Sequence, residues 1–349
     1  MALTVVGSIA FDSVTTPFGS AQRELGGSAV YAALAAAHFA PVRIVGPVGE
    51  DFAAEHERLL SGGGVDTSEL QRVPGGKTFS WRGRYDFDLS VAHTEETELN
   101  VFADWRPHLT GDARASDVLF LAAMDPETQA AVRREWGDGR MCALDTMSYW
   151  IEHARDALVE TIAGVDVVLL NDQEARELTG TPMLLGAARE IASWGPSAVV
   201  IKLGEYGCAL LHEDRYFSLP GYPLERIADP TGAGDAFAGG FLGYLDLTHG
   251  ELTAEVLRRA VTYGSVMASY CVEDFGPRRL VGLSDQEVHY RAGDFKHMTH
   301  FEHVPTATRP RDGAPPDGGE RLERPHDTPG TRKPEAPAPT AGTPRYDER

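Results

Sequence analysis

Short apolar runs alternate with helix-like stretches along most of this chain, and this alternation limits the fold more than any other feature. The runs are LTVVGSIAF, VRIVGPVG, DVLFLAAM, MCALD, VDVVLLN and AVVIKLG. Continuous apolar runs of this kind are typical of strands buried on both faces of a sheet. Helical patterns between them cover 29–39, 128–136, 172–178 and 185–194. We therefore expect a doubly wound α/β fold with a mostly parallel sheet, which binds ligands at the carboxyl ends of its strands.

One region departs from this alternation and predicts a small β lid. In TFSWRGRYDFD, residues 78–88, the aromatic side chains share one parity and the charged ones the other, as in a half-buried strand. The stretch TELNVFADW is a candidate partner strand. An ordinary edge hairpin whose aromatic residues cover the core explains the pattern equally well.

Charge and composition exclude several classes of partner. The chain holds 32 Lys and Arg against 52 Asp and Glu, a net charge of −20, which argues against nucleic acid or an anionic membrane surface as partner. No apolar run is long enough to span a membrane, and MALTVVGSIAF lacks the basic start of a signal peptide. Cys142, Cys208 and Cys271 lie apart in apolar runs, which indicates buried thiols and a cytoplasmic protein.

The end of the chain has a composition of its own. Residues 305–349 hold 10 of the 22 prolines and few large aliphatic side chains. Such a segment buries too little apolar surface to offset the entropy of ordering it. We expect a disordered Pro-rich tail.

The strongest chemical signal is an aspartate directly behind a glycine turn, in DPTGAGDAFAGGFLGYL, residues 229–245. Gly232 and Gly234 let the amides around Ala233 point into one concavity, and the following apolar run predicts a helix whose N-terminus faces the same place. Asp235 would repel an anion there unless it accepts the proton of a hydroxyl that attacks a phosphoryl group. For these four residues alone, an N-capping aspartate is an equally good interpretation.

This stretch resembles the C-terminal signature of the PfkB (ribokinase-like) family of carbohydrate and nucleoside kinases. Further landmarks follow the family's order, namely GSIAFD, GGSAVYAALAA, GPVGEDFA with GGGVDTSEL, NDQE and IKLGEYGCALL. The resemblance covers residues 3–285. It implies a ribokinase-like kinase domain over 1–304, with lid segments at about 12–24 and 75–105.

The resemblance also implies roles for particular residues. Asp235 is the catalytic base, and Gly232, Ala233 and Gly234 form the anion hole. The acceptor-binding residues are Asp12, Gly26, Gly27 and Ser28. The residues implied for ATP and Mg²⁺ are Asn171, Glu174 (which holds Mg²⁺ through a water), Lys202, Gly204 and Gly207. Asp229 and Thr231 match positions that bind a monovalent cation, K⁺, in some relatives.

Several of these residues have a second interpretation. Asn171 and Glu174 have the spacing of a helix-capping box, and Lys202 is also explained as a solvated lysine at a strand end. Ser28 stands where ribokinase-like sugar kinases usually carry Asn, so the hydroxyl groups recognised there differ. The adenine site is expected near the helix 264–271 and the loop VEDFGP that follows it.

The leading hypothesis is an ATP-dependent kinase that phosphorylates a hydroxyl, expected to be a primary alcohol, of a small sugar. A nucleoside kinase of the same fold is the alternative, and a catalytically silent sugar- or nucleotide-binding protein is a weaker one. The chain lacks the glycine fingerprint of a nicotinamide-dependent dehydrogenase. The GKT at 76–78 does not belong to a P-loop, because Gln71 stands where a P-loop requires glycine. The lid resembles the surface through which some relatives dimerise, which predicts a homodimer.

Overall fold

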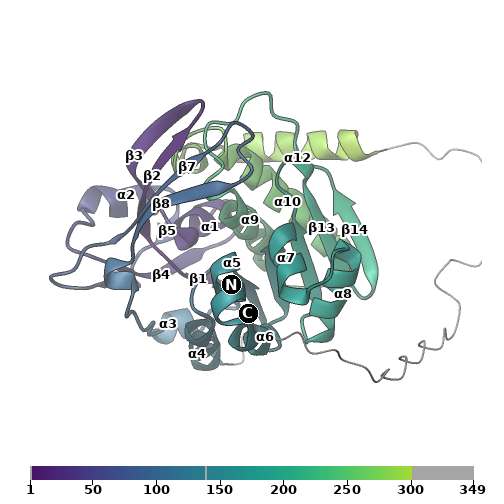
Figure 1. Cartoon of the computed structure of the whole chain (residues 1–349), viewed down its shortest axis with the longest axis horizontal. Helices are drawn as coiled ribbons and strands as arrows, with labels where there is room; N and C mark the ends of the chain where they lie inside the picture. Colours follow the sequence, from purple (N-terminus) through teal and green to yellow (C-terminus); the bar gives the residue numbers. More distant parts are fainter. Residues whose placement is uncertain (1, 138–139, 301–349) are drawn as a thin grey trace, which may run out of the picture. The chain divides into compact units, whose positions relative to one another are not determined.

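A large sheet forms the centre of the computed structural model, which describes residues 2–137 and 140–300 (Figure 1). Its strand order is β14-β13-β12-β11-β10-β9-β1-β4-β5, with β6 paired to β4. The strands from β12 to β5 run parallel, and β13 and β14 are antiparallel. The bounds are β1 (Leu3–Val6), β4 (Val42–Val48), β5 (Val65–Asp66), β6 (Leu70–Arg72), β9 (Val118–Leu121), β10 (Met141–Asp145), β11 (Val167–Asn171), β12 (Ala198–Lys202), β13 (Cys208–His212) and β14 (Arg215–Leu219).

The parallel strands are buried on both faces, as their continuous apolar runs predict. In β11, Val167 and Leu169 belong to the core on one face, and Val168 and Leu170 to the core on the other. One core is shared with α1 (Ser28–Ala36), α2 (Ala54–Gly62), α9 (Ala233–Leu247), α10 (Ala254–Cys271), α11 (Arg278–Val281) and α12 (Asp285–Thr299). The other is shared with α3 (Gly111–Arg114), α4 (Pro126–Trp136), α5 (Ser148–His153), α6 (Arg155–Ile162), α7 (Asp172–Thr179) and α8 (Leu184–Ser193).

A separate four-stranded sheet, here called the lid, has the order β3-β2-β7-β8 (Figure 1). Its strands are β2 (Ala10–Thr16), β3 (Gly19–Gly26), β7 (Phe79–Tyr85) and β8 (Ala92–Glu98). The expected α/β fold with a small β lid is therefore confirmed. The run LTVVGSIAF, expected as one strand, is divided between the sheets, because the chain leaves the large sheet at Gly7, where a Cβ would lie 2.7 Å from that of Ala122.

Two details of the lid differ from the expected hairpin. The register shifts between Arg82 and Gly83, and this bulge interrupts the alternation of aromatic residues. The Trp81 ring covers Gly83, and its indole nitrogen donates to Thr94 Oγ1 at 3.1 Å. Only the first residues of TELNVFADW belong to β8, because the chain turns at Asn100, whose φ is 48°, into the 3₁₀ turn η1 (Asn100–Phe102).

Helices α1 and α9 pack backbone against backbone. A Cβ on Gly239 would lie 2.1 Å from the carbonyl oxygen of Ala32, and one on Gly243 would lie 2.8 Å from that of Ala36. Side chains larger than hydrogen would separate the helices at these positions. The first turns of both helices are thereby fixed relative to each other at one edge of the sheet.

The three cysteines are buried and free. Within residues 2–137 and 140–300, no helix has the length and apolar character needed to cross a bilayer. The expected Pro-rich tail, 305–349, lies outside the residues that the structure describes.

Candidate active site

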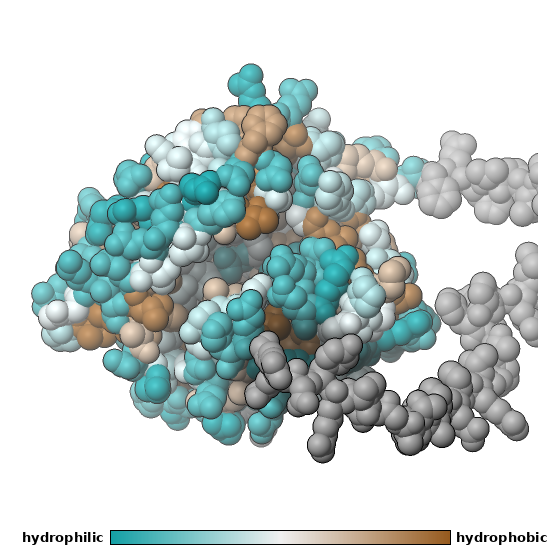
Figure 2. Space-filling model, in the orientation of Figure 1, coloured by the Kyte–Doolittle hydropathy of each residue, from teal (hydrophilic) through white to brown (hydrophobic). Residues whose placement is uncertain are grey.

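The predicted site residues come from segments that end at the carboxyl edge of the large sheet or in the lid beside it. Figure 2 shows the surface hollowed between the lid and helices α5 and α7. Asp12 comes from β2, Lys202 from the end of β12, and Asp235 from the first turn of α9. This is the edge at which doubly wound sheets bind ligands.

The glycine turn before α9 is held in a left-handed conformation. Gly232 has a φ of 77°, and a Cβ there would lie 2.4 Å from the ring of Tyr31 on α1. The amide of Ala233 donates to the carbonyl of Pro230 at 3.2 Å. The amides of Gly234 and Asp235 stand in the first turn and have no backbone acceptor among the described residues, so they are free to bind an anion.

Asp235 lies directly behind this turn. Burial raises the pKa of its carboxyl group to about 7, the neighbouring Asp145 carboxylate adds to the shift, and the Lys202 ammonium opposes it. A carboxylate with a pKa near neutrality suits a general base that works at physiological pH. The N-capping alternative receives no support, because no side-chain cap is formed at this helix and Gly232 occupies the cap position.

Lys202 points toward the same helix terminus. Its ammonium lies 3.2 Å from the position a Cβ of Gly234 would take, and 2.6 Å from Oδ2 of Asp145. The exposed fraction of its side chain is 15%, and that of the Asp145 side chain is 3%. The interpretation of Lys202 as a solvated strand-end lysine therefore fails, because the side chain is enclosed and ion-paired.

Asn171 and Glu174 form the capping box that the sequence allowed. Asn171 Oδ1 accepts the amide of Glu174 at 2.8 Å, and Glu174 Oε2 accepts the amide of Asn171 at 2.8 Å. The second carboxylate oxygen of Glu174 has no hydrogen-bond partner among the described residues. Burial raises the pKa of Glu174 to about 7, while the ammonium of Lys202 lowers it. The cap orients the carboxylate, and one oxygen remains available for the water shell of a metal ion.

Asp12 and the glycine pair form the other side of the site. A Cβ on Gly26 would lie 1.9 Å from Oδ2 of Asp12, so glycine is required there for the chain to pass the carboxylate. Burial raises the pKa of Asp12 to about 7, and the amide of Gly27 donates to it and opposes the shift. The carboxylates of Asp229 and Asp235 add smaller repulsions that also raise the pKa of Asp12.

The Ser28 hydroxyl is bound within the protein. Its oxygen lies 3.0 Å from that of Ser8, and the amide of Ser28 donates to Ser8 Oγ at 3.0 Å. This reciprocal pair joins the end of β1 to the start of α1. Ser28 therefore fixes the position of the glycine pair. An acceptor that contacted Ser28 directly would have to share the Ser28 hydroxyl with Ser8.

Asp229 and Thr231 lie in the loop that leads to the glycine turn. Asp229 Oδ1 accepts the amide of Thr231 at 2.9 Å, and burial raises the pKa of Asp229. The Thr231 hydroxyl lies 3.2 Å from that of Tyr85 on the lid strand β7. In the part of the chain that the structure describes, no three His, Cys, Asp or Glu side chains form a ready metal site.

Gly204 and Gly207 stand in the turn between β12 and β13, η2 (Gly204–Tyr206). A Cβ on Gly207 would lie 2.0 Å from the carbonyl oxygen of Leu219, so close packing against β14 requires this glycine. Nearly all of residues 264–271 on α10 are buried in the core, which leaves little of this helix for an adenine ring.

The sequence analysis did not predict three side-chain contacts at this site. Asp145 pairs with Lys202, Tyr85 contacts Thr231, and Tyr31 packs under Gly232 with its hydroxyl buried and unpartnered among the described residues. Asp145 ends a buried strand in MCALD, so the rule that selected Asp12 would also have selected it. Tyr31 and Tyr85 gave no such signal, because both look like ordinary core or lid aromatics.

Comparisons with known proteins agree with this geometry. The family of pfkB carbohydrate kinases matches residues 123–280. The cytidine kinase of Thermococcus kodakarensis is 34% identical over 248 residues, which cover 69% of this chain and 88% of that protein.

Solved structures show the same fold. The nucleoside kinase of Methanocaldococcus jannaschii, described as an archaeal member of the ribokinase family, has a TM-score of 0.68 at 18% identity and covers 84% of this chain and 98% of its own. A fructokinase from Vibrio cholerae O395, bound to fructose, ADP and calcium, also has a TM-score of 0.68, at 20% identity over 83% of this chain and 98% of its own. Similarity at this level establishes the fold and does not separate nucleoside from sugar kinases.

The cytidine kinase match extends over most of both proteins, and the catalytic signature of the family lies within the matched segment. The enzyme is therefore a kinase that uses ATP and an alcohol acceptor. This chain belongs to the pfkB family of carbohydrate kinases.

Proposed function

We propose that this enzyme transfers the γ-phosphoryl group of Mg-ATP to the primary hydroxyl of a nucleoside. The observation that carries the chemistry is the placement of Asp235 in the first turn of α9, beside free helix amides and near the Lys202 ammonium. The acceptor class departs from the plain sugar that the sequence analysis favoured. It follows the cytidine kinase of Thermococcus kodakarensis, which is 34% identical over 69% of this chain.

In the proposed reaction the acceptor oxygen bonds to the γ-phosphorus while its proton passes to Asp235. The bond from the γ-phosphorus to the β–γ bridging oxygen breaks, and its electron pair leaves with ADP. The free amides of Gly234 and Asp235 at the N-terminus of α9 receive the charge on the transferred group, and Gly232 and Ala233 form the turn that presents them. With a pKa of about 7, Asp235 is both ionised and basic enough to accept the proton near neutral pH.

On the acceptor side, Asp12 would bind the sugar part of the substrate. A carboxylate accepts two hydroxyl hydrogen bonds, which suits the vicinal diol of ribose. Gly26 leaves room for this carboxylate, the amide of Gly27 donates to it, and Ser28 fixes that turn.

The nucleotide would lie along the ends of β11 and β12. Asn171, Glu174 and Lys202 face its phosphates, and Gly204 and Gly207 shape the turn beside it. The residues fit a hydrated Mg²⁺ that is held mainly by phosphate oxygens, with Glu174 accepting a hydrogen bond from one of its waters. Bound Mg²⁺ neutralises phosphate charge during transfer. Asp229 and Thr231 are the residues we assign to a K⁺ ion.

The lid favours an acceptor without a phosphate group. Arg82 pairs with Glu96 at 3.1 Å, and Arg84 pairs with Asp86 at 2.6 Å, so the cations of β7 are already neutralised. Trp81 and Tyr85 present ring surface from the same strand, on which a nucleobase could stack.

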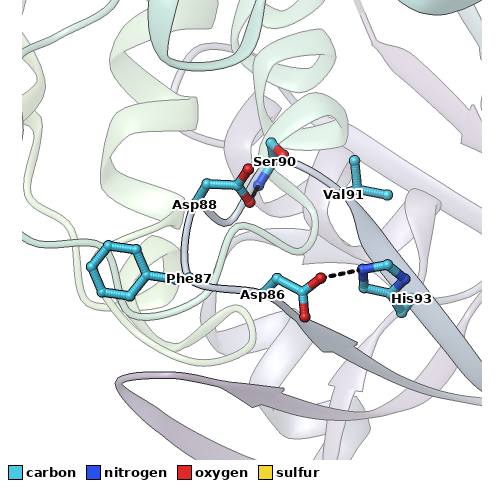
Figure 3. Close-up of a pocket in the computed structure, with 6 residues that line it drawn as sticks. All are labelled: Asp86, Phe87, Asp88, Ser90, Val91 and His93. Atoms are coloured by element: carbon cyan, nitrogen blue, oxygen red, sulfur yellow. Dashed lines mark hydrogen bonds and ion pairs between the residues drawn. The ribbon is translucent and has the colours of Figure 1, made fainter.

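We also infer a cytoplasmic homodimer formed through the lid. Figure 3 shows Phe87 at the hairpin tip pointing away from the Asp86–His93 pair. Phe87 is 83% exposed and Phe18 is 60% exposed, and their ring centroids lie 6.4 Å apart. Exposed aromatic side chains that meet at the hairpin tips of a sheet are typical of a protein interface.

The deciding experiment is an ADP-release assay with Mg-ATP against nucleosides, free sugars and sugar phosphates, with Asp235→Asn in parallel. We expect turnover with a nucleoside, lowered by several orders of magnitude in the variant. Turnover with a sugar alone would reject the nucleoside and keep the mechanism. No turnover with any acceptor, with equal ATP binding by both proteins, would favour a catalytically silent binding protein.

A further inference from the structure

Asp145 and Lys202 form a buried ion pair directly under the anion hole. Asp145 Oδ1 accepts the amide of Thr146 at 2.9 Å, and Oδ2 accepts the Lys202 ammonium at 2.6 Å. The carboxylate is thus held from two sides at the end of β10. The ammonium that it binds lies against Gly234, in the turn that binds the transferred group in the proposed function.

Three carboxylates act on this one ammonium, each from a different element. They belong to Asp145 on β10, Glu174 on α7 and Asp235 on α9. Among the described residues, only Asp145 lies within ion-pair distance. A lysine side chain is flexible enough to choose another partner, and a pair with Asp235 would engage the oxygen atoms that must take the proton.

We propose that Asp145 is a positioning residue, which holds the Lys202 ammonium at the anion hole and away from Asp235. Lys202 then meets the transferred phosphoryl group as a preorganised charge, and Asp235 remains free as the base. This inference rests on the proposed phosphoryl transfer. A buried pair that served only stability would show no such division of roles.

The test uses the variants Lys202→Met, Asp145→Asn and the double variant, each in the full-length protein. Asp145→Asn leaves an ammonium without its partner, and this change can prevent folding. Asp145→Glu keeps the charge and moves it by one methylene group, so it provides a folded alternative. Asp166→Asn is the matched control, because Asp166 accepts the amide of Cys142 at 2.8 Å at the opposite end of β10.

If Asp145 acts through Lys202, the effects of the two changes do not multiply. We expect Lys202→Met to lower kcat by about 10²-fold to 10³-fold, the range seen when one preorganised donor is removed. Asp145→Asn and Asp145→Glu should lower kcat by about tenfold or more, and the double variant should match Lys202→Met within about threefold. Asp166→Asn should retain the kcat of the unmodified enzyme.

A second readout does not need an acceptor. Titration calorimetry with Mg-AMP-PNP and Mg-ADP measures the preference for the nucleotide that carries a γ-phosphoryl group. We expect Lys202→Met, Asp145→Asn and Asp145→Glu to reduce this preference by about threefold or more, because each removes or displaces the charge that meets that group. Asp166→Asn should leave it unchanged.

The proposal is overturned if the folded Asp145 variants keep kcat and nucleotide preference within about twofold of the unmodified enzyme, or if the two losses multiply in the double variant. Failure of the unmodified enzyme to phosphorylate any acceptor would reject the proposed function instead. The nucleotide titrations would then still decide whether Asp145 places Lys202.

Discussion

The hydroxyl of Tyr85, on the lid strand β7, lies 3.2 Å from the hydroxyl of Thr231, in the loop that leads to the glycine turn of α9. Burial raises the pKa of Tyr85 to about 12, so the group is a neutral phenol at any working pH. A second contact joins the same two parts, because Thr16 of β2 donates to the carbonyl of Ala228 at 3.0 Å. The lid is therefore bound to the loop that precedes α9.

Tyr85→Phe should weaken the attachment of the lid to this loop without disturbing the fold of the lid. Loss of one neutral hydrogen bond corresponds to about 0.5–1.5 kcal/mol, so we expect kcat/KM for the acceptor to fall about threefold to tenfold. Steady-state kinetics with varied acceptor measures this change. The control is Tyr290→Phe, because Tyr290 is 73% exposed on α12. Equal activity of both variants would show that the bond does not contribute to catalysis.

Activity should rise with pH through neutrality. Asp235 accepts a proton only when ionised, and its pKa of about 7 places the midpoint of kcat/KM near pH 7. Below the midpoint, kcat/KM should rise with pH more steeply than the loss of a single proton would produce. The reason is that Asp12 also has a pKa of about 7 and must be ionised to accept hydroxyl hydrogen bonds. In Lys202→Met the midpoint should move to higher pH, since the ammonium lowers the pKa of Asp235. A profile that is flat from pH 5 to 8 would contradict the role of Asp235 as the base.

Stability should change in the opposite sense. The pKa of Asp235 rises from 3.8 to about 7 on folding, so the folded state holds a proton that the unfolded state releases between these values. Its contribution to stability is present below about pH 4 and is lost as the pH rises to about 7. Asp235→Asn does not titrate, so we expect its free energy of unfolding to exceed that of the unmodified protein by about 4 kcal/mol at pH 8 and by about 2 kcal/mol at pH 5. Urea unfolding at both pH values measures the difference, and an equal effect at both would refute the assigned shift.

Gly26→Ala should damage the acceptor side alone. The added methyl group would occupy the space of the Asp12 carboxylate, whose oxygen lies 1.9 Å from the Cβ position. We expect kcat/KM to fall about 10²-fold, as for other misplacements of a binding group, with ATP affinity retained. Gly62→Ala is the control, because a Cβ there meets nothing within 4 Å. Equal losses of acceptor and ATP affinity in Gly26→Ala would indicate general unfolding instead.

Gly232→Ala tests the glycine turn. The residue has a φ of 77°, and its Cβ would meet the Tyr31 ring, so strain and overpacking add to a loss of about 2–4 kcal/mol. Gly75→Ala separates the two causes, because Gly75 has a φ of 74° and open space around its Cβ position. We expect it to lose about 1 kcal/mol, measured by urea unfolding. Similar losses in both variants would mean that Tyr31 adapts and does not restrict the turn.

The sequence predicted the buried parallel strands β1, β4 and β9 to β12 of the large sheet, because apolar runs buried on two faces have few other solutions. It predicted the small lid but not its details. The bulge at Gly83 depends on the Trp81 ring covering that residue, which is a contact within the folded sheet. The division of the first apolar run depends on the close approach of Ala122 to Gly7. Neither contact is visible in a local pattern.

The candidate site was predictable where a residue type is tied to a motif. The family of kinases followed from the glycine turn, and Asn171 with Glu174 was correctly anticipated as a capping box. The partner of Lys202 was not predictable, since Asp145 is 57 residues away and only the sheet brings the two together. The hydrogen bond of the Ser28 hydroxyl was also not predictable, because its partner, Ser8, follows the first strand and is brought close only by the fold.

The backbone contact between α1 and α9 has a consequence for the evolution of substrate preference. The turn at Gly26 precedes one helix and the turn at Gly232 precedes the other, so in the proposed function two abutting main chains would set the distance between the acceptor and the phosphoryl group. A change of acceptor would therefore require changes in lid side chains, while the distance between the two turns stays the same. An acceptor whose reactive hydroxyl lies farther from its diol would be refused, whatever the lid allows.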